Sequence, residues 1–94
     1  MKDYAITKDL LRELVQTMPP VFDSHALIIQ AMQRHPQLYT MDLYSFVASD
    51  DPIQQLHASI GQRLLGIDTI EPTRRVPSQN VRGQTSENQE WRRK

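Results

Sequence analysis

The chain has 94 residues, of which 38% are hydrophobic and 6% aromatic. This length suits one small domain and excludes scaffolds built from several domains, because a separate hydrophobic core normally needs on the order of 100 residues. Eleven Lys and Arg balance eleven Asp and Glu, so the total charge predicts no long-range attraction to nucleic acid or to an anionic membrane. The chain contains no cysteine, which excludes disulfides, thiolate zinc ligands and thiol nucleophiles.

The start of the sequence, MKDYAITKDLL, carries charges where a signal peptide needs an apolar stretch. No later segment approaches the ~20 consecutive apolar residues of a membrane span. We therefore expect a cytoplasmic protein that has no membrane partner.

The first two predicted helices are bounded by capping residues and prolines. The first runs from about Thr7, a suitable cap, to Met18, where two prolines end it. Its apolar face is either part of the core or a surface for dimerisation. The second helix begins at Asp23 or Ser24 and continues to Arg34 or His35, because Pro36 follows.

The third predicted helix is short, from Thr40 to about Ala48, and its many apolar residues predict that it is mostly buried. The fourth, Pro52 to Leu65, has the clearest boundaries, since an Asp precedes it and a Gly follows it. Gly61 lies inside this helix, either to permit close approach of another backbone or without a packing reason. One apolar stripe of the fourth helix should face the core: Ile53, Leu56, Ile60 and Leu64.

The sequence divides into a helical body, residues 1–70, and a polar, basic tail of the same domain, residues 71–94. The tail is either a β-hairpin, with strands near Asp68–Val76 and Asn80–Gln84, or a flexible extension. Its prolines limit any strand to an edge of a sheet, and the residues just before Trp91 should be the most mobile. The predicted fold is mainly α: a four-helix body with at most a small C-terminal, two-stranded hairpin.

The third and fourth predicted helices, joined by the polar turn Ser49–Asp51, have the spacing of a helix-turn-helix motif. In that motif the second helix presents a face without acidic groups to the major groove. No Asp or Glu occurs between Pro52 and Ile67. Gln can pair with adenine and Arg with guanine, so the predicted base-contacting residues are Gln55, Ser59, Gln62 and Arg63. The alternative is that this polar face is simply solvated.

The charges are distributed unevenly along the chain. Residues 1–62 contain four basic and seven acidic residues, a net charge of −3, whereas residues 63–94 contain seven and four, a net charge of +3. Arg74, Arg75 and Arg82 lie where a wing would follow a recognition helix, so we expect them to contact phosphate. Trp91 either stacks on nucleic acid or packs on the body or a partner. The sequence thus predicts a module that binds double-stranded DNA.

The order of apolar helix, short helix, turn, amphipathic helix and Arg-containing hairpin ending near Trp91 resembles the winged helix-turn-helix superfamily, over roughly Phe22 to Trp91. The segments FDSH, QLYTMDLY and DDPIQQLHASIGQRLL are also similar to small bacterial and mobile-element proteins that have no established activity. The resemblance implies a winged-helix fold with the hairpin as its wing. The chain departs from the family in its neutral charge.

A second hypothesis keeps the same scaffold but binds no nucleic acid. The chain would then be a protein-interaction or adaptor module that binds another protein or forms a homodimer. Its aromatic anchors would be Tyr4, Tyr39 and Trp91.

Nothing in the sequence predicts catalysis, a metal or a cofactor. The three histidines lack the short helical spacing that places two imidazoles on one metal. Asp23, Ser24 and His25 contain the residue types of a catalytic triad, but their adjacency is explained by the start of a helix. The three glycines form no phosphate-binding loop. We therefore expect that the protein is not an enzyme.

Overall fold

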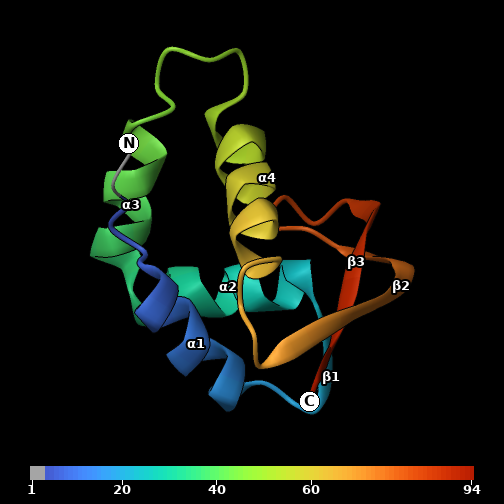
Figure 1. Cartoon of the computed structure of the whole chain (residues 1–94). Helices are drawn as coiled ribbons and strands as arrows, with labels where there is room; N and C mark the ends of the chain where they lie inside the picture. The colour runs from blue at the N-terminus through green and yellow to red at the C-terminus, as the bar shows by residue number, and fades with distance from the viewer. Residues whose placement is uncertain (1–3) are drawn as a thin grey trace.

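The structure is a computed structural model that describes residues 4–94. Roughly half of the chain is helical, and three antiparallel strands form one sheet in the order β1-β3-β2 (Figure 1). The fold is therefore a compact α/β fold. The four helices and the C-terminal hairpin agree with the prediction, but the third strand shows that the expected limit of two strands, and with it the mainly α class, is wrong. In chain order the elements are α1 (Lys8–Thr17), β1 (Val21–Asp23), α2 (Ser24–Arg34), α3 (Pro36–Tyr44), α4 (Pro52–Leu64), β2 (Ile70–Gln79) and β3 (Thr85–Arg93).

Three of the four helices begin where their capping residues predict. The side chains of Thr7, Asp23 and Asp51 each accept a hydrogen bond from the backbone N–H three residues later, at 3.2, 2.9 and 3.3 Å. Each bond satisfies one of the N–H groups that a helix leaves unpaired in its first turn. The prediction for α1, α2 and α4 is therefore confirmed to within about a residue.

The predicted span of the third helix, Thr40 to Ala48, is wrong. α3 runs from Pro36 to Tyr44, because Pro36, which stops α2, also suits a first helical turn that needs no N–H donor. Residues 45–48 continue as turns, and the connection to α4 comprises residues 45–51. It is longer than the turn of three or four residues expected in a helix-turn-helix motif. Nor is α3 mostly buried, since Tyr39 and Asp42 are its only buried residues.

Strand β1 has no counterpart in the sequence-based prediction. Its three residues pair with β3, so that Phe22 lies opposite Trp91 of the central strand. A strand of three residues is too short to show an alternating pattern. Through this pairing the C-terminal strand is attached to the helical body rather than left as an extension.

The C-terminal hairpin exists, but its second strand lies further along the chain than predicted. Asn80–Gln84 forms the turn, in which Gly83 has a φ of 76° and the Asn80 carbonyl accepts a hydrogen bond from Gly83 N. β3 begins at Thr85 and is the central strand. The residues before Trp91, which were expected to be the most mobile, belong to this strand: Thr85–Gln89 pair with β2, and Glu90 pairs with Asp23 of β1.

The prolines of β2 occupy positions that agree with the sequence-based prediction. β2 is an edge strand, and its register against β3 shifts between Pro72 and Arg75. An edge position tolerates proline because the missing N–H would face away from the neighbouring strand. Such a shift interrupts the regular pairing and is typical of a local bend in the strand.

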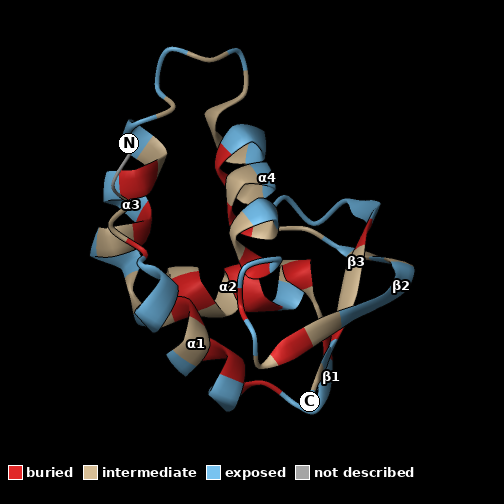
Figure 2. Cartoon of the chain, in the orientation of Figure 1, coloured by how far each residue is buried: buried red, intermediate tan, exposed pale blue. Residues whose placement is uncertain are grey.

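The core lies where α1, α2 and α4 meet the sheet (Figure 2). The apolar face of α1 is part of this core, since Leu11, Leu14 and Val15 are buried within the chain itself. In the predicted stripe of α4 three residues are buried, whereas Ile53 is only partly covered. The largest fully buried side chains are Trp91, Ile6, Leu11, Leu14, Leu27, Ile28, Leu56, Ile60, Leu64 and Val15.

Candidate nucleic-acid interface

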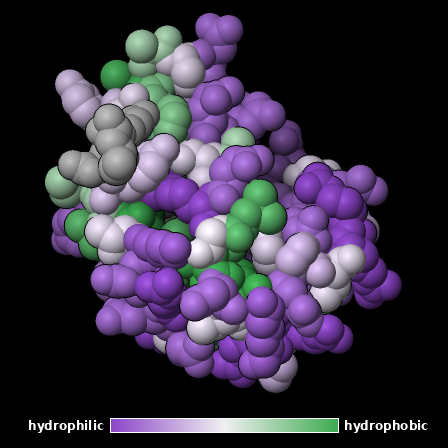
Figure 3. All heavy atoms as spheres, in the orientation of Figure 1, coloured by the Kyte–Doolittle hydropathy of each residue, from purple (hydrophilic) through white to green (hydrophobic). Residues whose placement is uncertain are grey.

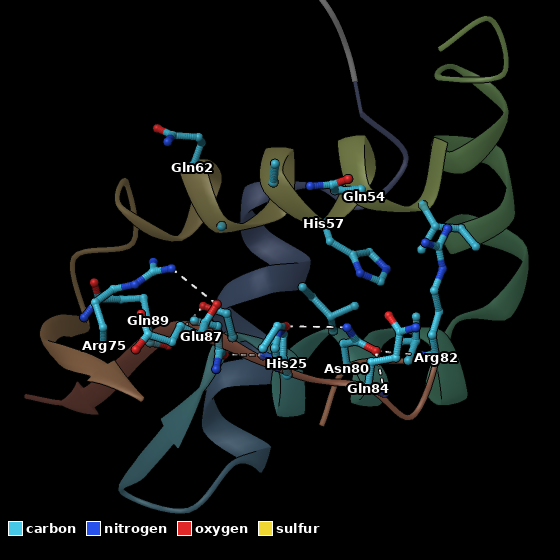
Figure 4. Close-up of a pocket in the computed structure, with 18 of the residues that line it drawn as sticks. His25, Gln54, His57, Gln62, Arg75, Asn80, Arg82, Gln84, Glu87 and Gln89 are labelled. Carbon is cyan, nitrogen blue, oxygen red and sulfur yellow. Dashed lines mark hydrogen bonds between the residues drawn. The ribbon is translucent and has the colours of Figure 1, made fainter. Parts of the chain in front are cut away.

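A cleft of about 690 Å³ lies between α4 and the β2–β3 hairpin, and the N-terminal end of α2 forms its floor (Figure 4). This volume is in the range of small-ligand sites. The formal charges of the residues that line the cleft sum to zero, because the lining contains two Arg, one Asp and one Glu. The polar side chains that line it are Ser24, His25, Asp51, Gln54, His57, Gln62, Arg75, Asn80, Arg82, Gln84, Ser86, Glu87, Asn88 and Gln89.

The structure brings together three of the seven residues predicted to contact nucleic acid. Gln62 lines the helical wall of the cleft, and Arg75 and Arg82 line the wall formed by the hairpin. Gln55 is exposed on α4 outside the cleft, and Ser59 is half-buried there. Arg74 is exposed on β2, with its Nε 3.4 Å from the Glu90 carboxylate.

Arg63 points away from the cleft, toward α3 and the N-terminal segment. Its Nη1 donates to the carbonyl of Ile6 at 2.8 Å and lies 3.4 Å from Asp42 Oδ2, and its guanidinium sits 3.7 Å from the centre of the Tyr4 ring. Burial lowers the pKa of Arg63, and the Asp42 carboxylate opposes this shift. Because these contacts occupy the side chain, we leave Arg63 out of the candidate interface.

Arg82 is paired with Asp51, the capping residue of α4. Its two terminal nitrogens donate to the two carboxylate oxygens at 3.0 and 2.6 Å, a bidentate arrangement. The contact lowers the pKa of Asp51 and raises that of Arg82. The tip of the hairpin is thus joined to the N-terminal end of α4.

A polar network missed by the sequence analysis attaches the hairpin to α2. His25 Nδ1 is 2.8 Å from Ser78 Oγ, and the His25 backbone N–H donates to Asn88 Oδ1 at 2.8 Å. Trp91 Nε1 donates to Ser24 Oγ, also at 2.8 Å. The sequence offers Ser24 and His25 only as the start of a helix, because nothing local indicates which strand they will face.

His57 projects from α4 toward the hairpin, and its Nε2 lies 2.8 Å from the hydroxyl of Tyr39 (Figure 4). Burial, together with the nearby His25 and Arg82, lowers the pKa of His57 to about 4, and the Asp51 carboxylate opposes this shift. The imidazole is therefore neutral near pH 7 and can donate or accept a hydrogen bond within the cleft.

We expect His57 to make the stability of the protein depend on pH. Its pKa of about 4 in the folded state lies below the ordinary value of 6.5, so the unfolded state binds more protons between these values. The contribution of His57 to the free energy of unfolding is therefore complete above about pH 6.5 and is lost as the pH falls toward about 4. For a partly exposed side chain we expect a loss of about 1–2 kcal/mol.

Urea unfolding followed by circular dichroism at about pH 7 and about pH 5 measures this loss. His57→Gln should reduce the difference between the two pH values, whereas His35→Gln, at the end of α2, should leave it as in the wild type. An unchanged difference in His57→Gln contradicts the assignment.

Gly61 lies in the middle of α4 beside the cleft, and a Cβ built there meets no atom within 4 Å. No other backbone approaches this glycine closely, so close packing does not explain why a glycine lies at this position. We expect Gly61→Ala to raise the free energy of unfolding by about 0.5–1 kcal/mol, because Ala loses less backbone entropy in a helix. Urea denaturation tests this, and the exposed Ala58→Gly should lower stability by a similar amount. A less stable Gly61→Ala variant would count against the open space seen beside this position.

Within residues 4–94 no three His, Asp or Glu side chains come together in a group that could hold a metal ion. The longest helix of the same residues, α4, has 13 residues, and none is both long and apolar enough to cross a membrane. No protein-family model, curated protein or solved structure matches the chain.

Proposed function

We propose that the chain binds double-stranded DNA as a winged-helix-like module, with α4 in the major groove and the β2–β3 hairpin as the wing. The observation that carries this proposal is the position of α4, whose exposed face has no acidic side chain and borders the hairpin across the cleft. The order of elements and the sheet order β1-β3-β2 are similar to those of winged-helix domains, with α3 as an additional helix.

The exposed face of α4 has the chemistry that base recognition needs. Gln54, Gln55 and Gln62 are exposed, and Ala58 between them is small. A Gln side chain can form two hydrogen bonds with adenine, and small neighbours allow the helix to approach the base edges. At 1.5 Å per residue α4 is about 20 Å long, sufficient to lie along a major groove about 12 Å wide.

Arg75 is the strongest candidate for a phosphate contact. Among residues 4–94 no carboxylate lies within ion-pair distance of it, and its Nη2 donates only to the backbone carbonyl of Glu87 at 3.3 Å. Arg74 and Arg82 instead have carboxylate partners. The cation at Arg75 is therefore available without breaking an ion pair.

A titration with duplex DNA, followed by amide chemical shifts at about 50 mM salt, tests the proposal. Arg75→Ala should weaken binding to all sequences and reduce the salt dependence by about one counterion, because one phosphate contact is lost. Gln62→Ala or Gln55→Ala should change the preference among sequences by about 1–3 kcal/mol. Arg34→Ala, at the end of α2, is the matched control and should bind as the wild type does. If no amide of α4 or the hairpin shifts with any duplex, DNA binding is rejected.

A second candidate function, a protein-interaction module, is favoured by exposed apolar side chains at the end of α3 and after it. Met41, Tyr44 and Val47 are 61%, 74% and 62% exposed, and Figure 3 shows hydrophobic surface at the tip of the α3–α4 connection. Such a patch is typical of a contact surface. If it joins two copies of the chain, sedimentation should show self-association that Tyr44→Ser weakens. A monomer at all protein concentrations would reject a homodimer.

A further inference from the structure

We infer that Asp51 competes with DNA phosphate for Arg82, so that the ion pair between the hairpin tip and α4 limits the affinity of the protein for DNA. This inference rests on the proposed function. It assigns to Asp51, the residue that caps α4, a second role as an internal anionic partner of the wing.

The geometry of the pair supports this competition. Asp51 presents two oxygens to the two terminal nitrogens of Arg82 at 3.0 and 2.6 Å. A phosphate group binds a guanidinium in the same bidentate way, through two parallel N–H···O bonds. The donors that a phosphate would use are therefore already engaged by the carboxylate.

The two partners are positioned independently, on opposite sides of the cleft. The Asn80 side chain accepts hydrogen bonds from the backbone N–H groups of Arg82 and Gln84, at 2.9 and 3.2 Å, and so holds the hairpin turn. Asp51 is held by its capping bond to Gln54 N at 3.3 Å. Figure 4 shows Arg82 at one end of the cleft, on the hairpin. Rotation of the Arg82 side chain can break the pair while both local structures persist.

The ion pair between Arg82 and Asp51 also reduces the uncompensated positive charge of the hairpin. With the pair closed, the positive charge of Arg82 is compensated by Asp51. When a phosphate replaces the carboxylate, Asp51 remains near the DNA backbone as an unpaired anion and repels it. Asp50, one residue earlier, carries the same charge, so a comparison of Asp51 with Asp50 removes this repulsion and leaves the hold of Asp51 on Arg82 as the difference.

The substitution Asp51→Asn separates these effects from the folding of α4, because Asn caps a helix as well as Asp does. The matched control is Asp50→Asn, which removes the same charge from the adjacent, exposed residue, for which no ion pair is found among residues 4–94. The probe is a fluorescently labelled duplex of mixed sequence at about 50 mM salt. Circular dichroism checks that both variants keep the helical content of the wild type.

We expect Asp51→Asn to bind this duplex about two- to fivefold more tightly than Asp50→Asn, the size of effect expected for a half-exposed ion pair. In an Arg82→Gln background, the advantage of Asp51→Asn over Asp50→Asn should disappear, as a double-mutant cycle requires for a direct interaction. Without DNA, the Arg82 Nε–H resonance should shift in Asp51→Asn and stay unchanged in Asp50→Asn.

The outcomes distinguish this inference from the proposed function. Tighter binding by Asp51→Asn than by Asp50→Asn, with the advantage lost in the Arg82→Gln background, supports the competition. Equal affinities of Asp51→Asn and Asp50→Asn overturn the competition and leave DNA binding intact. An advantage that persists in the Arg82→Gln background also overturns it, because simple repulsion then suffices. If neither the wild type nor any variant binds, both proposals are rejected.

Discussion

Trp91→Ala should lower the free energy of unfolding by about 3–5 kcal/mol, which is a large part of the stability of a domain of this size. The side chain is 2% exposed and lies in the central strand, opposite Phe22 on one side and Pro72 on the other. Its removal would leave a cavity where the sheet meets the helices, and the neighbouring backbone is too constrained to fill it. The loss of the bond from Nε1 to Ser24 Oγ adds to the cost.

Urea denaturation followed by circular dichroism measures the effect of Trp91→Ala. Trp91→Phe keeps much of the packed volume and should cost less, whereas Ser24→Ala leaves the indole N–H without its acceptor and should cost about 1–3 kcal/mol. A Trp91→Ala variant that unfolds at the same urea concentration as the wild type contradicts the packing described here.

Asp42→Ala should also lower the free energy of unfolding by about 3–5 kcal/mol. Asp42 is 3% exposed, and its two oxygens accept hydrogen bonds from the backbone N–H groups of Ala5 and Ile6 at 2.6 and 3.0 Å. The same carboxylate lies 3.4 Å from Arg63 Nη1. Its removal leaves two backbone donors unpaired and a largely buried cation without its counter-charge, which costs far more than an exposed ion pair contributes.

A substitution of Arg63 separates the cost of the uncompensated cation from the cost of the two unpaired backbone donors. In Asp42→Ala/Arg63→Met the uncompensated cation is gone, so the double variant should be more stable than Asp42→Ala alone. Hydrogen exchange should show faster opening of the Ile6 amide in both variants, because its acceptor is missing. If the double variant is no more stable than the single one, Arg63 is not the main source of the cost.

The sequence by itself determined the features that depend on neighbouring residues. Thr7, Asp23 and Asp51 cap the helices that they were expected to cap, because a capping side chain needs only the N–H three residues ahead. The apolar periodicity of α1 and α4 predicted most of the residues that these helices bury. The edge position of β2 follows from its prolines.

Only the tertiary structure decided the features that join distant parts of the chain. β1 is a strand because β3 pairs with it, and its three residues have no pattern of their own. Arg63 lies outside the predicted interface because it contacts Asp42, which lies 21 positions earlier in the chain. The pair of Arg82 with Asp51 spans 31 positions and that of Trp91 with Ser24 spans 67. Capping and apolar periodicity depend on residues a few positions apart. The partner of a charged group or a buried N–H can instead be distant in the sequence, because it depends on which residues lie nearby in the folded chain.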